Sequence, residues 1–175
     1  MQMEGRSMTY ILISINPPYT KQIFSGEKTV EWRRRPLPNG TYYCYETKNG
    51  GGCGMVIGEF EITGNRVFTR GETVPPRFIK AGCVDAEYLR EYAGYGDKAS
   101  LAANYIRHVV LYDNPVPITE FWKVGKCPYS SLDGCTYKSR GLGHINCFRG
   151  GETQRCGTTV ANPPQSWMRV ERRTL

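Results

Sequence analysis

The sequence predicts a single α+β domain built mainly from short strands, and three features of its composition lead to this prediction. The chain has 175 residues, a length that fits one domain. Hydrophobic residues make up 39% of it, which is enough for one core. Its 20 Gly and 11 Pro residues favour many short elements joined by turns over a bundle of long helices.

The first predicted elements are a strand and a short helix. Residues 10–15 (YILISI) form an apolar, β-branched run that is typical of a buried strand. Pro17 and Pro18 end this strand and can open a helix over residues 19–25, because proline is tolerated in the first helical turn. Gly26 then stands where a glycine commonly closes a helix.

The next segment, residues 29–35 (TVEWRRR), alternates in side-chain character and predicts a second strand. Successive side chains of a strand point to opposite faces. Val30 and Trp32 are therefore predicted to face the core, whereas Glu31 and Arg33 share the other face.

The remaining elements follow from apolar runs and turn signals. The glycine-rich residues 49–54 separate two strand candidates and predict a hairpin. Asp85 can cap a helix that runs to about Tyr92 and is closed by Gly94. The other predicted elements are strands at 41–45, 55–62, 104–112 and 166–171 and a short helical turn at 118–122.

The predicted domain spans residues 8–175, after an N-terminal tail of residues 1–7, and contains a Cys- and Gly-rich insertion at residues 126–161. Four cysteines of the insertion could ligate a structural zinc ion, but no pair shows the short C-x2–4-C spacing usual in such sites. We therefore expect free thiols and no cofactor, with structural zinc as the alternative. The four residues are Cys127, Cys135, Cys147 and Cys156.

Charge and cysteine content indicate the partners and the compartment. The net charge is +7, which favours an anionic partner such as a nucleic acid. No apolar run approaches the roughly 18 residues that a membrane-spanning helix needs, so no membrane partner is expected. Seven cysteines without an apolar export signal indicate a reducing compartment, and we expect the protein to be cytoplasmic.

Residues 26–33 carry the spaced motif G-x-K-x-x-E-x-R. Gly26 lets the helix end sharply, Lys28 lies at the turn, and Glu31 and Arg33 project from one face of the strand. A carboxylate between two cations combines hydrogen-bond acceptors and donors, which suits a nucleobase with its phosphate. The motif therefore predicts a small polar pocket around these three side chains.

Together with the strand and helix before it, this motif resembles the ASCH domain family of the PUA-like superfamily, in its bacterial and phage members. The resemblance implies a PUA-like small mixed β-barrel with short covering helices and a basic cleft for RNA or another nucleotide-like ligand. Further segments that resemble the family are residues 42–47, 54–60, 105–112, 115–121 and 164–167.

The resemblance implies a module that binds nucleic acid, RNA before DNA, or a nucleotide. Some compact family members hydrolyse an acetylated cytidine with the motif lysine and a threonine, so a small amidohydrolase using Lys28 and Glu31 is the alternative. Glu31 stands at the threonine's position, and Thr29 lies two residues too early to replace it, so we expect binding rather than catalysis. The predicted nucleic-acid-binding residues are Lys28, Glu31, Arg33, Arg34, Arg35, Tyr45, Gln165, Ser166 and Trp167.

Overall fold

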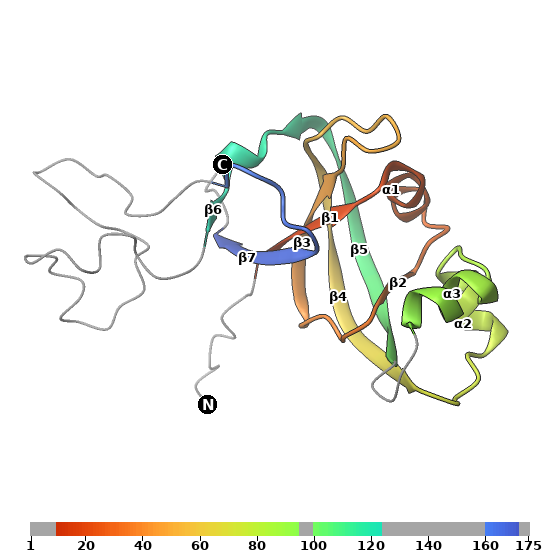
Figure 1. Ribbon diagram of the computed structural model, residues 1–175. Helices are drawn as coiled ribbons and strands as arrows, with labels where there is room; N and C mark the ends of the chain where they lie inside the picture. The colour runs from red at the N-terminus through yellow and green to blue at the C-terminus, as the bar shows by residue number, and fades with distance from the viewer. Residues whose placement is uncertain (1–9, 95–99, 124–159, 172–175) are drawn as a thin grey trace, which may run out of the picture.

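The computed structural model describes residues 10–94, 100–123 and 160–171. Its strands form a mixed sheet in the order β2-β5-β4-β3-β1-β7-β6 (Figure 1). β1 and β3 run parallel, and the other neighbouring pairs are antiparallel. The elements are β1 (Tyr10–Ile15), α1 (Pro17–Phe24), β2 (Val30–Arg33), β3 (Gly40–Glu46), β4 (Val56–Thr69), α2 (Pro76–Ala81), α3 (Ala86–Ala93), β5 (Ser100–Val116), η1 (Ile118–Glu120), β6 (Trp122–Lys123) and β7 (Trp167–Glu171).

The predicted α+β class is confirmed as a mixed sheet with a few short helices. The barrel implied by the resemblance is not observed, because no strand pairing joins the edge strands β2 and β6 in the described part of the chain. Side chains reach across the open side of the sheet instead. The guanidinium of Arg33 at the end of β2 donates to the carbonyl oxygen of Ser14 on β1.

β4 is longer than the sequence predicted, because a bulge replaces the expected end of the strand. The prediction ended this strand at Ile62, whereas the pairing with β5 resumes at Asn65 after a shift in register. A bulge bends a strand without ending it. Helix α2 was not predicted at all, although Pro75 and Pro76 supply a common opening for a helix.

Two groups of buried side chains position the helices against the sheet. Ile23 of α1 packs into a cluster that includes the stacked rings of Tyr42 and Phe60, whose centroids lie 5.7 Å apart. Leu89 of α3 packs into a second cluster with Trp32 of β2. α3 therefore packs against β2, the strand that carries Glu31 and Arg33, and α1 leads into the turn before β2 (Figure 1).

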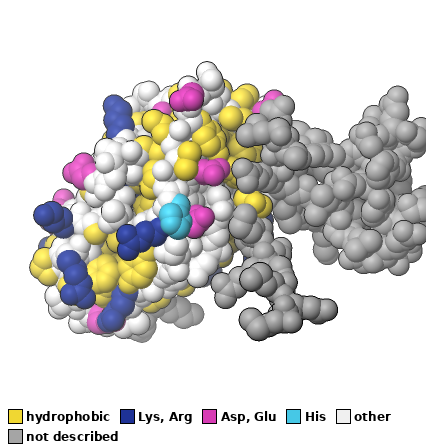
Figure 2. All heavy atoms as spheres, turned by 180° about the vertical axis from the view of Figure 1, so that it is seen from behind, with side chains coloured by type: hydrophobic (Ala, Val, Ile, Leu, Met, Phe, Trp, Pro, Cys, Tyr) yellow, Lys and Arg dark blue, Asp and Glu magenta, His cyan; other side chains and the backbone are white. Residues whose placement is uncertain are grey.

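The opposite side of the molecule exposes hydrophobic side chains among Lys and Arg side chains (Figure 2). Two large hydrophobic residues of β5 are among those exposed: 49% of the surface of Val110 and 59% of that of Leu111 are accessible to solvent. His108 on the same strand is exposed and pairs through Nδ1 with Glu61 Oε2 at 2.8 Å. None of the helices that the structure describes is long and apolar enough to cross a membrane.

Candidate functional site

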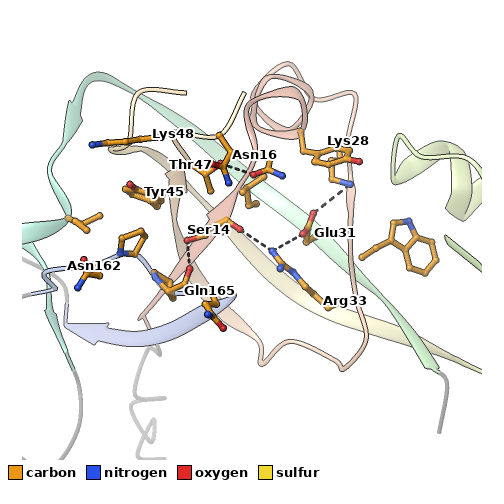
Figure 3. Close-up of a pocket in the computed structure, with 18 of the residues that line it drawn as sticks. Ser14, Asn16, Lys28, Glu31, Arg33, Tyr45, Thr47, Lys48, Asn162 and Gln165 are labelled. Carbon is orange, nitrogen blue, oxygen red and sulfur yellow. Dashed lines mark hydrogen bonds and ion pairs between the residues drawn. The ribbon is translucent and has the colours of Figure 1, made fainter. Parts of the chain in front are cut away.

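A pocket of about 790 Å³ opens between α1, β2, α3 and the segment before β7. Lys28, Glu31 and Arg33 form a connected chain on one side of this pocket, whereas Tyr45 and Lys48 lie on the other side (Figure 3). The three motif side chains are therefore brought together in one pocket, as the spacing predicts.

The turn between α1 and β2 delivers Lys28 to the pocket. Gly26 has a φ of +80°, a left-handed conformation that glycine adopts easily at the end of a helix. The N–H of Lys28 then donates to the carbonyl oxygen of Gln22 at 2.8 Å, which turns the chain back along α1. The N–H of Thr29 donates to the carbonyl oxygen of Ala81 at 2.9 Å and holds the end of α2 beside this turn.

Lys28 is buried, with only 3% of its surface exposed. Its Nζ donates to the carbonyl oxygen of Gly82 at 2.6 Å and lies 3.6 Å from Glu31 Oε2. It also lies 5.0 Å from the ring centroid of Tyr19. Burial lowers the pKa of Lys28, and the Glu31 carboxylate partly opposes this shift. Lys28 thus forms part of the pocket wall and presents little surface to a ligand.

Glu31 uses both of its carboxylate oxygens within the motif. Oε1 accepts from Arg33 Nη2 at 2.9 Å, and Oε2 faces Lys28 Nζ. Its backbone carbonyl accepts from Asn104 Nδ2 at 2.9 Å, which fixes this part of β2 on β5. The Glu31 carboxylate therefore orients the two cations. Because both of its oxygens are in use, the motif offers a ligand N–H donors and not acceptors.

Arg33 is the motif residue that is open to the pocket, with 17% of its side chain exposed. Nη2 is occupied by Glu31 and by the Ser14 carbonyl oxygen at 3.2 Å. Nη1 makes only a long contact of 3.5 Å with Ser166 Oγ. Nε is buried and has no hydrogen-bond partner among the described residues. Because a buried N–H without a partner is costly, an acceptor from a ligand would stabilise Nε–H, and Nη1 can donate to a second acceptor.

The other predicted binding residues divide between the pocket and its surroundings. Tyr45 and Gln165 line the pocket, on the side away from Lys28. Ser166 is not part of the pocket lining, but its Oγ contacts Arg33 Nη1 at 3.5 Å. Outside the lining are Arg34, Arg35 and Trp167.

Arg34 acts on helix α3 and not on the pocket directly. Its Nε donates to the carbonyl oxygen of Tyr92 at 2.8 Å, and its guanidinium lies 5.5 Å from the centroid of the Tyr92 ring. These contacts fasten the last turn of α3 to the end of β2. Trp167 on β7 is 37% exposed and does not face the pocket.

The pocket is also lined by three tyrosines that were not predicted from the sequence as binding residues: Tyr19, Tyr88 and Tyr92. Tyr88 and Tyr92 are stacked, with centroids 5.9 Å apart and planes inclined by 6°. Burial raises the pKa of both phenols, so both remain neutral at physiological pH. Their spacing of four residues predicts a pair on one face of a helix, but no local signal connects that face with the motif.

Thr29, considered as a substitute for the missing catalytic threonine, is exposed and does not line the pocket. The four insertion cysteines lie outside the described residues, as do residues 1–7 and most of the insertion. In the residues that are described, no group of three or more His, Cys, Asp or Glu side chains is arranged to hold a metal ion.

The chain matches no protein-family model and no curated protein. Among solved structures, it is similar to the crystal structure of ASCH from Zymomonas mobilis, with 22% identity and a TM-score of 0.58 over 93% of this chain and 87% of that one. A serine-to-alanine variant of that protein matches with 22% identity and a TM-score of 0.57, over 93% of this chain and 88% of the variant. A tyrosine-to-phenylalanine variant matches with 21% identity and a TM-score of 0.58, over 93% of this chain and 90% of the variant. The chain therefore has the ASCH fold, as the resemblance implies, although its described strands do not close into a barrel.

Proposed function

We propose that this ASCH-fold chain is a binding module for single-stranded RNA or a nucleotide, with the pocket around Arg33 as its binding site. The observation that carries this proposal is the partly unused guanidinium of Arg33. Among the described residues, its Nε lacks a partner and its Nη1 makes only a 3.5 Å contact. Nε–H and Nη1 lie on different edges of the guanidinium, so each can donate separately to a phosphate oxygen or to the carbonyl oxygen or ring nitrogen of a base.

The rest of the motif supports this role by holding Arg33 in place. Glu31 fixes Nη2 of the guanidinium at 2.9 Å, so less side-chain freedom remains to be lost when a ligand binds. Lys28 adds a positive charge behind Glu31, at 3.6 Å from its Oε2. With Lys28 protonated, one carboxylate lies between two cations, and the motif retains a net positive charge for an anionic ligand.

Side chains around the pocket supply the other contacts that a nucleotide needs. Tyr19 and Tyr88 offer aromatic rings for a base, because base stacking on aromatic side chains tolerates any sequence. Lys48 on the opposite side adds a further cation, and Gln165 adds an amide that can donate and accept. The net charge of +7 adds general attraction for a polyanion. Within the described residues the cysteines are free thiols, which fits the proposed cytoplasmic location.

Fluorescence anisotropy with a short single-stranded RNA tests the proposal. Binding is expected to weaken steeply as salt rises, because phosphate contacts release counterions. Arg33→Gln is expected to weaken binding by about tenfold, the effect of losing a charge-assisted hydrogen-bond pair. Lys80→Gln, which removes the charge of an exposed lysine on α2, is the matched control and should have a much smaller effect.

Equal losses in Arg33→Gln and Lys80→Gln would mean general charge attraction and would remove the pocket from the proposal. A separate measurement addresses the amidohydrolase alternative. Release of acetate from acetylated cytidine, abolished in Lys28→Met, would show that the buried lysine serves catalysis. We expect no release above background, because the pocket-lining residues do not include a threonine at the position that the hydrolysing family members use.

A further inference from the structure

A second, shallower hollow of about 460 Å³ adjoins the pocket along the other side of Tyr19 and Tyr88. These two tyrosines, with Val84, line both hollows. The two aromatic rings therefore form a ridge between the Arg33 pocket and this second hollow. A chain of two nucleotides that crossed the ridge would place one unit in each hollow.

The ridge is held rigidly on the α3 side. Asp85 caps the helix by accepting from the N–H of Tyr88 at 2.6 Å. Leu89 is buried in the core, and the stacked Tyr92 ring supports that of Tyr88. Tyr88 itself remains 41% exposed. An exposed aromatic ring with a fixed backbone is a suitable surface for a base, since little conformational freedom is lost on stacking.

The chemistry of the second hollow differs from that of the pocket. No lysine or arginine lines it among the described residues, whereas Glu27 and Asp85 do. It is therefore a poor site for a phosphate. Gln22 also lines this hollow, and its Oε1 is buried without a hydrogen-bond partner in the part of the chain that the structure describes. A buried acceptor beside carboxylates fits a ligand that donates, such as the exocyclic amino group of a base.

We propose that the second hollow is a subsite for the neighbouring base of a single-stranded oligonucleotide, and that it favours a base with an exocyclic amino group. The inference rests on the proposed function, because it takes the nucleotide in the Arg33 pocket as the starting point. Tyr88 stacks with the neighbouring base, and Gln22 Oε1 accepts from its amino group. The ligand of the module is then an oligonucleotide of at least two units and not a free mononucleotide.

The test compares the dissociation constants of cytidine 5′-monophosphate and its 5′-phosphorylated dinucleotide, measured by calorimetry on the full chain. The second nucleotide is expected to tighten binding by about tenfold, the gain from one stacked base. In Tyr88→Ala this gain should fall to within about twofold. The gain is a ratio of two dissociation constants in the same variant, so it does not depend on any change in the affinity for the mononucleotide, whose pocket Tyr88 also lines. Tyr88→Phe keeps the ring and should retain the gain. The same pair of uridine ligands, which lack the exocyclic amino group, should show a smaller gain, and Gln22→Leu should remove the difference between cytidine and uridine.

The second subsite would be overturned if the dinucleotide kept its full affinity gain over the mononucleotide in Tyr88→Ala. That includes the case in which both cytidine ligands lose affinity by the same factor. Equal gains for cytidine and uridine in the wild type would overturn the preference for an amino group. Binding of the mononucleotide that does not change in Arg33→Gln would count against the proposed function instead. The two proposals can therefore fail separately. The dinucleotide gain in Tyr88→Ala tests the second subsite, and mononucleotide binding in Arg33→Gln tests the proposed function.

Discussion

Arg33 on β2 donates to the carbonyl oxygen of Ser14 on β1 at 3.2 Å, across a side of the sheet that no pairing between the described strands closes. The same Nη2 holds the Glu31 carboxylate at 2.9 Å. One guanidinium therefore links two strands that lie far apart in the sheet order and also faces the pocket. Its substitution should affect stability and binding together.

Arg33→Lys tests this double role, because it keeps the charge and removes the planar fork. A single ammonium cannot replace the contacts of Nη2 with Glu31 and Ser14 and also present a second donor edge to a ligand. We expect the free energy of unfolding in urea to fall by about 1–2 kcal/mol, the value of one or two lost hydrogen bonds. Affinity for single-stranded RNA should fall by about tenfold. Arg35→Lys, outside the pocket lining, is the control and should leave both quantities near those of the wild type.

Glu31→Gln should lower the free energy of unfolding, although the amide has nearly the same shape as the carboxylate. Glu31 is 8% exposed and separates Lys28 from Arg33. Without its charge, two cations would face each other with a neutral amide between them, and breaking a buried ion pair costs about 3–5 kcal/mol. The measurement is chemical denaturation of Glu31→Gln, Lys28→Met and the double variant. The double variant should be less destabilised than the sum of the single changes, and strict additivity would contradict the coupling of these side chains.

Lys28 gives the stability of the protein a defined dependence on pH. Burial lowers the pKa of Lys28 in the folded state, so the unfolded chain retains this proton to higher pH. Unfolding therefore takes up a proton between the two pKa values, and the free energy of unfolding rises with pH through that window. The cost of burying the charge is present in full below the folded-state pKa and disappears as pH approaches the ordinary lysine range.

The corresponding measurement is the free energy of unfolding of the wild type relative to Lys28→Met, from about pH 7 to pH 10. This difference should move in favour of the wild type as pH rises. Comparison with the variant cancels the groups that titrate in both proteins. Lys80→Met, at an exposed lysine, is the matched control and should show a flat difference over the same range. A flat difference for Lys28→Met as well would show that the Lys28 pKa is not lowered.

The parts of the fold that the sequence predicted are those with local signals. The apolar run predicted as a strand has the same bounds as β1, Tyr10–Ile15. Asp85 caps α3, as its position in the sequence indicates. The extension of β4 beyond Ile62 could not be predicted, because it depends on pairing with β5 after a bulge. The barrel closure was an expectation taken from the resemblance, and the pairing of the strands that the structure describes does not show it.

The motif was predictable as a cluster, but not the division of roles within it. Spacing alone treats Lys28 and Arg33 as equivalent cations. Their difference depends on residues distant in sequence: the Gly82 carbonyl oxygen that takes up Lys28, 54 positions away, and the Ser14 carbonyl oxygen that positions Arg33, 19 positions away. Tyr88 was missed for the same reason, since only the packing of α3 beside β2 brings it to the pocket.

Gly82 connects the motif with the core, and its substitution makes a sharp prediction. Its carbonyl oxygen accepts from Lys28 Nζ at 2.6 Å, and a Cβ built at this position would overlap the indole Nε1 of Trp32. Its φ of −89° suits any residue, so the effect of Gly82→Ala would come from this overlap and not from backbone strain. Forcing a methyl group into a packed site costs about 1–3 kcal/mol, and we expect a loss of that size in urea unfolding.

Two further variants separate overlap with Trp32 from other effects of the added methyl group. Gly64→Ala is the control, because its Cβ would meet Tyr105 at 3.5 Å, an ordinary contact distance, and it should cost less than Gly82→Ala. Trp32→Phe removes the nitrogen with which the new methyl group collides, and that nitrogen has no hydrogen-bond partner to lose among the described residues. In the Trp32→Phe background, Gly82→Ala should therefore destabilise less than it does in the wild type. An undiminished loss in that background would place the cost of the methyl group elsewhere, at the end of α2 and its contact with Lys28.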